Sequence, residues 1–272
     1  MMAGEDAPVA SHESHEKFFD YYAQESLSSE TTERCTSIRD VAIQLYRVHN
    51  PFALGALDVA DVGCGAGTQS MIWAREGHKV HSVDINEPLV KLGHQRALQE
   101  GVDIDFRVGS ATALPWGDNS MDICLVPELL EHVPDWRSCV NEVARVLRPG
   151  GLLFLSTTNK LCPKQQEFSL PFYSWYPGPL KRYCERLAQT TRPEIVNYAK
   201  YPAVNWFSFY GLREFLRTLS FSSMDRFDVI DLTRRGLLVR GLVTCIRRVP
   251  MLRWLGHVTM PSLLLFAIKN RT

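Results

Sequence analysis

The chain lacks a long apolar run, a paired cysteine motif and any acidic residue after Asp231. Its longest uncharged apolar stretch, 254–268, falls short of the ~20 residues that span a bilayer, and Pro261 interrupts it. The seven cysteines are odd in number and contain no Cys-x-x-Cys, which favours reduced thiols in a cytoplasmic protein. Residues 1–16 are polar and lack the apolar segment of a signal peptide.

The charge is balanced overall but unevenly distributed. A formal net charge of zero argues against a dedicated nucleic-acid binder, so we expect no nucleic acid partner. From Leu232 onward, however, every charged side chain is basic, which gives this end roughly +8 and the remainder roughly −8.

Strand-like and helix-like patterns alternate through the middle of the chain. Apolar runs at 57–62, 79–84, 104–108, 121–126 and 152–156 are separated by helical patterns that include 68–76, 87–100 and 136–147. A helical pattern at 37–48 precedes them, and 263–269 is typical of a last strand. This alternation predicts an α/β fold: a Rossmann-like, doubly wound sheet, mostly parallel with an antiparallel last strand and helices on both faces.

The same patterns divide the chain into four parts. Residues 1–50 are expected to form a disordered tail and lid helices, and 51–158 the Rossmann-like core. Residues 159–210 are dense in Phe, Tyr and Trp, which indicates an insertion that caps the sheet, either as an acceptor pocket or as plain packing. Residues 211–272 complete the core and carry a basic, apolar insertion at 232–262.

A glycine-rich turn follows the first strand of the core. In Asp61-Val-Gly63-Cys64-Gly65-Ala-Gly67 the glycines alternate, and a helix is expected to begin directly after them. Glycines allow the backbone to turn tightly and approach a ligand, and the helix start offers free N–H groups. The dinucleotide fingerprint Gly-x-Gly-x-x-Gly/Ala would place a small residue at Thr68, so the match to nicotinamide enzymes is imperfect.

Asp84 ends the second strand, about 20 residues after the turn. An acid at this place is positioned to accept hydrogen bonds from both ribose hydroxyls of a nucleotide-like cofactor. The alternative is an aspartate that only caps the next helix.

Taken together, these motifs resemble the class I S-adenosylmethionine-dependent methyltransferases, in the branch of the ubiquinone and menaquinone biosynthesis enzymes. The order of motifs is similar: 61–67, Asp84, 109–116, 121–133 and the turn 147–151. The resemblance implies that S-adenosyl-L-methionine is the cofactor. The cofactor-binding residues it implies are Asp61, Gly63, Cys64, Gly65, Gly67, Asp84, Ile85, Ser110, Ala111 and Pro127.

Ser110 departs from the family pattern. The family commonly has an acid here that accepts a hydrogen bond from the adenine amino group. A neutral serine is a weaker acceptor, whereas the N–H of Ala111 still reaches the ring in this interpretation.

The segment Glu128-Leu-Leu-Glu131-His132 lies at the expected rim of the active site. The resemblance implies three alternatives for it: structural support of the loop, His132 as a general base, or a divalent metal held by Glu128, Glu131 and His132. Methyl transfer needs little more than alignment of the nucleophile with the methyl carbon and sulfur.

We therefore expect O-methylation of a partly apolar small molecule or a lipid-linked acceptor. The rivals are a non-enzymatic S-adenosylmethionine-binding partner protein and an NAD-dependent oxidoreductase. Leu238, Leu242, Ile246 and Val249 share a helical face beside several arginines, and Pro250 suggests a hinge. Such a segment predicts peripheral contact of 232–262 with the inner face of a membrane; a hairpin packed on the sheet edge and an oligomer interface are the alternatives.

Overall fold

A seven-stranded sheet forms the centre of the computed structural model, which describes residues 28–165, 167–196, 203–233 and 235–271. The strand order is β3-β2-β1-β4-β5-β7-β6, with β1–β5 pairing in parallel and β7 running antiparallel between β5 and β6. This topology confirms the predicted fold class. The strands are β1 Asp58–Val62, β2 Lys79–Asp84, β3 Ile104–Val108, β4 Met121–Pro127, β5 Leu147–Thr158, β6 Phe221–Asp225 and β7 Ser262–Lys269.

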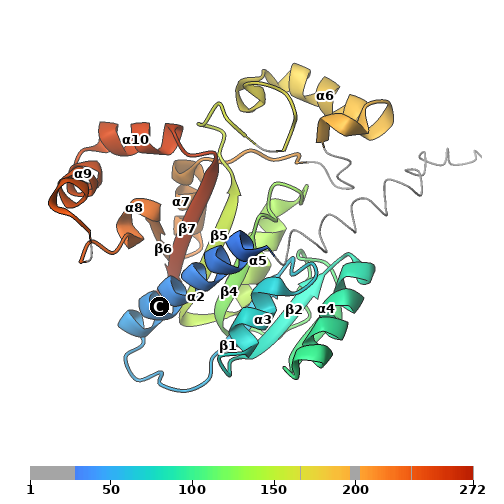
Figure 1. The fold of residues 1–272 in the computed structure, drawn as a ribbon, viewed down its shortest axis with the longest axis vertical. Coiled ribbons are helices and arrows are strands. Elements are labelled where there is room, and N and C mark those ends of the chain that lie inside the picture. The colour runs from blue at the N-terminus through green and yellow to red at the C-terminus, as the bar shows by residue number, and fades with distance from the viewer. Residues whose placement is uncertain (1–27, 166, 197–202, 234, 272) are drawn as a thin grey trace, which may run out of the picture.

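Helices cover both faces of the sheet (Figure 1). One face packs against α2 Ser29–His49, α3 Thr68–Ala74 and α4 Glu87–Glu100, and the other against α5 Trp136–Val146 and α7 Phe209–Thr218. The central strands are therefore buried on both sides, which explains why β4 and β5 are almost continuously apolar.

Local sequence signals set the ends of α4. The side chain of Asn86 accepts a hydrogen bond from the N–H of Leu89, Pro88 occupies the first turn, and Gly101 ends the helix in the left-handed conformation. These signals place α4 and, through it, the loop that follows Asp84.

Two elements differ from the sequence expectation. The predicted turn at 148–151 is part of β5, which shifts register against β4 and uses the left-handed Gly150 (φ 83°) to absorb the irregularity. The edge strand β6 has no equivalent in the expectation, because its sequence Phe-Ser-Ser-Met-Asp is too polar to suggest a strand without its partner β7.

The two insertions fold differently from each other. Residues 159–196 contain η1 Tyr173–Trp175, α6 Gly178–Thr190 and η2 Pro193–Val196, and they bury a small cluster of their own around Phe168 and Tyr173. The basic insertion forms α9 Leu237–Arg248 and α10 Pro250–Val258 after the short α8 Arg226–Val229, so the break expected at Pro250 is present, with Pro250 as the first residue of α10.

The length and apolarity of a helix determine whether it can cross a membrane. None of the helices in the described part of the chain combines the length and apolarity needed to cross a bilayer. The expected lid helix near residues 15–22 lies outside the described residues.

Candidate functional site

The glycine turn between β1 and α3 depends on three backbone conformations that favour glycine. Gly63, Gly65 and Gly67 have φ of 78°, 51° and 77°. A Cβ on Gly67 would lie 2.6 Å from the ring of Phe106, so this position also lacks space for a side chain. The N–H groups of Gly63 and Cys64 donate to the carbonyl of Val83 and tie the turn to the end of β2.

Asp61 supports this turn from inside the protein. Its carboxylate is fully buried and accepts a hydrogen bond from the hydroxyl of Ser70 on α3 at 2.5 Å, while Oδ1 has no hydrogen-bond partner among the described residues. Burial raises the pKa of Asp61 to about 6, against the lowering effect of the Ser70 hydroxyl. The carboxyl group therefore links β1 to α3 beneath the turn.

Asp84 faces the turn from the end of β2. Its carboxylate accepts hydrogen bonds from the N–H of Gly65 at 2.8 Å and of Asn86 at 2.7 Å. Burial raises the pKa of Asp84, and the two backbone donors oppose that rise. The carboxylate is thus fixed in orientation at the edge where the parallel strands end.

A cavity of about 550 Å³ opens at this edge. Its lining includes Gly63, Asp84, Ile85, Ser110, Ala111 and His132, all six of which are predicted site residues. Ile85 is largely exposed, so an apolar face is available to a ligand ring. Asp61, Cys64, Gly65, Gly67 and Pro127 do not line the cavity.

Those five residues have other places in the fold. Gly65 and Asp61 hold the turn, Cys64 is a buried thiol whose pKa is raised by burial, and Pro127 ends β4 opposite Ser156. Their expected role as direct cofactor contacts stays a prediction.

The side chain of Ser110 forms hydrogen bonds within its own loop. Its hydroxyl lies 2.8 Å from the hydroxyl of Thr112 and accepts a hydrogen bond from the Thr112 N–H at 3.2 Å. The side chain that replaces the family's acid is therefore already engaged locally.

A second polar group lies beside the cavity. Glu131 is fully buried, accepts a hydrogen bond from Thr157 at 2.8 Å through Oε2, and leaves Oε1 without a hydrogen-bond partner among the described residues. Glu167 approaches from the aromatic insertion, with Oε2 3.9 Å from Nε2 of His132. Burial and the charge of Glu128 raise the pKa of Glu131 well above its usual range and that of Glu167 to about 7.

This arrangement alters the predicted metal set. Among the described residues, one ligand atom from each of Glu131, His132 and Glu167 lies within 4.8 Å of the others, which is compatible with a metal ion. Glu128, named in the sequence expectation, is not in this group. Glu167 was missed because it lies in an insertion without a recognisable motif, far along the chain from His132.

The aromatic insertion also departs from expectation. Its aromatic side chains were expected either to form an acceptor pocket or to pack on the sheet, but of this segment's described residues only Val204 lines the cavity. Tyr176 and Trp206 pack against the insertion's own cluster, and Trp175 is exposed. Leu129, Val133 and Pro134 line the cavity without having been predicted.

Comparison with protein families gives a direct match to the core. Residues 60–155 match a family described as a methyltransferase domain. The ubiquinone biosynthesis O-methyltransferase of Xanthomonas euvesicatoria pv. vesicatoria is 40% identical over 119 residues, which are 43% of this chain and 50% of that protein. The chain thus spans about half the length of the curated relatives it matches.

Solved structures share the fold at lower identity. A SAM-dependent methyltransferase from Methanosarcina mazei is 20% identical with a TM-score of 0.52, over 83% of this chain and 98% of that one. The [4+2]-cyclase SpnF is 19% identical with a TM-score of 0.50, over 84% and 82%. The shared fold thus occurs in proteins named for different reactions, so the reaction must be argued from the site. The family match to a methyltransferase domain weighs against the nicotinamide-dependent alternative.

Proposed function

We propose that this chain, whose residues 60–155 match a methyltransferase domain, uses S-adenosylmethionine to methylate an oxygen of a partly apolar small molecule or lipid-linked acceptor. The observation that carries the proposal is the cavity, because Gly63 of the glycine turn, Asp84 and His132 all line it. The similarity to the Xanthomonas ubiquinone biosynthesis O-methyltransferases favours oxygen as the methylated atom.

Several lining residues, namely Gly63, Asp84, Ile85 and Ala111, fit S-adenosylmethionine, which supplies an electrophilic methyl group when it is bound. Asp84 accepts hydrogen bonds from the ribose hydroxyls, and the N–H groups at the start of α3, directly after the glycine turn, receive the carboxylate of the methionine end. Ile85 packs on the adenine face, and the Ala111 N–H donates to the ring.

His132 is suited to take the acceptor's proton. In the step, a lone pair of the acceptor oxygen forms the bond to the methyl carbon while the carbon–sulfur bond breaks. The hydroxyl proton passes to the imidazole of His132, and the electron pair of the broken bond stays on sulfur. Alignment of these atoms provides most of the acceleration.

A divalent cation fits the group beside the cavity. The unpartnered oxygen of buried Glu131, together with His132 and Glu167, supplies the oxygen and nitrogen donors that such an ion binds. A cation held there lowers the pKa of a phenolic hydroxyl, which would replace the need for a base. If the cation is bound, Glu167 links the aromatic insertion through it to the hydroxyl that is methylated.

We place the reaction in the cytoplasm. All seven cysteines are free thiols and six of them are buried, an arrangement suited to a reducing compartment. The acceptor is expected to reach the cavity from the side of the aromatic insertion, next to Val204.

The direct test is methyl transfer to defined acceptors. Purified full-length protein is incubated with methyl-labelled S-adenosylmethionine and a series of catechols whose alkyl or prenyl tail increases in length. We expect a methyl ether by mass spectrometry and a KM that falls as the tail grows. Binding of S-adenosylhomocysteine without transfer to any acceptor or lipid extract would instead favour a non-enzymatic cofactor-binding protein.

The metal is tested in the same assay. Chelation followed by Mg²⁺ or Zn²⁺ addition should remove and restore activity, and Glu167→Gln should weaken metal binding in calorimetry by at least about tenfold. Glu185→Gln in the same insertion is the matched control. Activity that survives chelation and Glu167→Gln but falls in His132→Ala would leave His132 as the base without a metal.

A further inference from the structure

The α9–α10 hairpin exposes apolar side chains on its outer side. Leu238 is 91% exposed, Met251 71% and Trp254 46%, and Leu237, Leu242 and Leu255 are exposed as well. We define these six residues, with Arg240 and Arg248, as the α9–α10 surface. In the two helices only Val243 and His257 are buried, so the hairpin presents much more apolar surface than its own packing needs.

We propose that the α9–α10 surface docks on a membrane whose headgroups are anionic. Leu238 and Leu242 lie one turn apart on α9, and Met251 and Leu255 lie one turn apart on α10, so each helix has an apolar stripe. Arginines beside leucine and tryptophan suit a helix that lies at the boundary between headgroups and acyl chains.

The arginines divide into two groups with different roles. Arg247 donates to the carbonyls of Phe227 and Ile230, and Arg253 pairs with Asp225, so both hold the hairpin to the protein. Arg240 and Arg248 are exposed on α9, and no ion pair involves them among the described residues. Since no acid follows Asp231, an anionic surface is the partner whose charge complements this hairpin.

The hairpin is fixed at the end of the sheet that bears the cavity. Asn159, directly after β5, donates through Nδ2 to the carbonyls of His257 and Met260, both at 2.8 Å. The ring of His257 stacks on Phe209 of α7, and Gly256 lies against the ring of Phe227. The hairpin is therefore anchored on its inner side, and its outer side faces away from the sheet.

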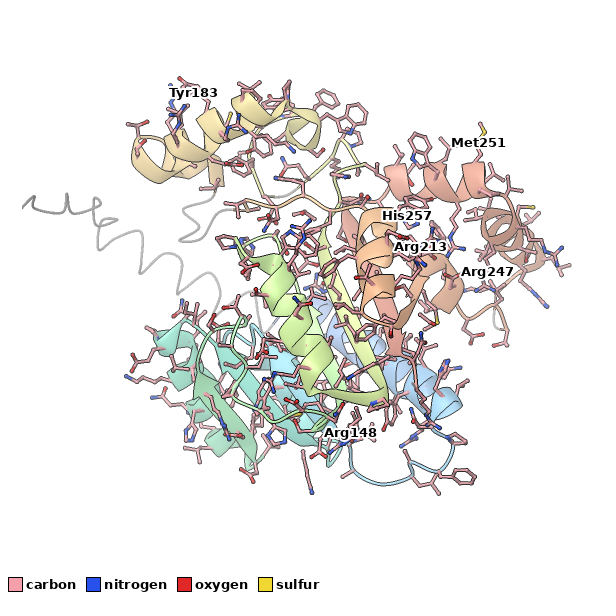
Figure 2. The ribbon with its side chains drawn as sticks, turned by 180° about the vertical axis from the view of Figure 1, so that it is seen from behind. Arg148, Tyr183, Arg213, Arg247, Met251 and His257 are labelled. Carbon is pink, nitrogen blue, oxygen red and sulfur yellow. The ribbon has the colours of Figure 1, made fainter. Side chains whose placement is uncertain are left out.

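The two insertions are at the same end of the molecule (Figure 1). Figure 2 shows Met251 on the outer side of α10 and Tyr183 on the outer side of α6, both pointing away from the sheet, whereas His257 lies on the inner side. Docking through α9–α10 would thus bring the insertion-bearing end, and the cavity with it, toward the lipid. Membrane docking through this surface does not depend on which acceptor is methylated.

The test is flotation of the full chain, without cofactor, on phosphatidylcholine vesicles with and without 30% phosphatidylglycerol. We expect binding only to the anionic vesicles in 50 mM salt and its loss in 500 mM salt. Arg240→Gln with Arg248→Gln should lower the partition coefficient about 25-fold. Leu238→Ser with Met251→Ser should lower it at least about tenfold.

Two exposed positions away from the hairpin provide matched controls. Leu98→Ser on α4 removes an equally large exposed side chain, and Lys79→Gln removes a charge at the opposite end of the sheet; both should bind within twofold of the original chain. Melting temperature and S-adenosylhomocysteine affinity verify that each variant is folded.

Three results would overturn the proposal. They are absence of flotation on anionic vesicles at low salt, retention of binding in both double variants, and a dimer by ultracentrifugation that Leu238→Ser with Met251→Ser dissociates while vesicle binding is absent. The last result would assign the surface to a second copy of the chain.

Discussion

Asp84 is the polar side chain of the cavity whose orientation is most firmly set, because two backbone N–H groups hold its carboxylate. Asp84→Ala removes a charged acceptor for the ribose and also frees the N–H of Gly65. We expect the affinity for S-adenosylhomocysteine to fall at least about tenfold in calorimetry. Glu87→Ala, an exposed acid on the neighbouring α4, should leave the affinity unchanged, and equal affinities for all three proteins would refute the assignment.

The buried carboxyl group of Asp61 leads to a prediction about the stability of the fold, not about cofactor binding. Its pKa is raised by burial to about 6 in the folded protein and is about 4 in an unfolded chain. Between these values the unfolded chain has released its proton and the folded one has not, so a rise in pH through this window favours unfolding. The full cost, up to about 3 kcal/mol, is present above pH 6.

Asp61→Asn keeps an acceptor for Ser70 and removes the buried charge. The free energy of unfolding of the variant minus that of the original chain should be near zero at pH 4, grow toward pH 6 and then stay constant. Urea denaturation at four pH values measures this difference, with the exposed Asp103→Asn as the control. A difference that does not vary with pH would mean that the carboxyl group is not protonated by burial.

The glycine turn shows how a single element combines conformational strain and lack of space. Gly67 and Gly77 are both left-handed, with φ of 77° and 81°, but a Cβ meets Phe106 only at Gly67 and open space at Gly77. Gly77→Ala should therefore cost about 1 kcal/mol from backbone strain alone. Gly67→Ala should cost a further 1–3 kcal/mol, roughly, from overpacking.

The additional loss of stability from Gly67→Ala should be smaller when residue 106 is already Leu. The comparison is between the double variant Gly67→Ala with Phe106→Leu and Phe106→Leu alone. Thermal unfolding of the four proteins gives the coupling between the two positions. Equal losses at Gly67 and Gly77 would show that the ring of Phe106 moves aside freely.

A helix or strand is predicted well from the sequence where the residues that define it are close together in the chain. The expected helix 87–100 matches α4, whose ends are set locally by Asn86 and Gly101, and the apolar runs predicted β1 to β4 within a residue or so. The edge strand β6 and the extension of β5 through 148–151 escaped prediction, because both depend on pairing with a strand far away in the sequence.

For the whole molecule, the division between predicted and unpredicted site residues follows the same rule. Gly63, Asp84, Ile85 and His132 meet at the cavity because each closely follows a core strand, and such strand ends converge in a parallel sheet. Glu167 comes from the aromatic insertion, and its position beside His132 is set by the packing of that insertion. No pattern in the sequence predicts a contact of this kind.

The anchoring of the basic insertion depends on a buried charge cluster. The Oδ2 atom of Asp225 accepts from Nε2 of His257 at 2.8 Å and from Nε of Arg253 at 2.7 Å, and Oδ1 caps the start of α8. Burial acts to raise the pKa of Asp225, but these two partners outweigh it and hold the pKa at about 2. Since the folded pKa is lowered, the ionised carboxylate stabilises the fold above pH 4 and loses this effect as the pH falls toward 2.

Asp225→Asn should release the α9–α10 hairpin while leaving the cofactor site intact. The amide keeps an oxygen acceptor but not the negative charge, so Arg253 and His257 lose the carboxylate that they share, a change that typically costs about 3–5 kcal/mol. We expect trypsin to cleave after Arg240 and Arg248 at least about tenfold faster than in the original chain or in Asp103→Asn. The affinity for S-adenosylhomocysteine should stay within twofold, because none of the cavity residues forms a hydrogen bond or ion pair with Asp225 among the described residues. A parallel loss of cofactor affinity would show that the hairpin and the cofactor site unfold as one unit, whereas unchanged cleavage would mean that packing of Gly256 on Phe227 holds the hairpin by itself.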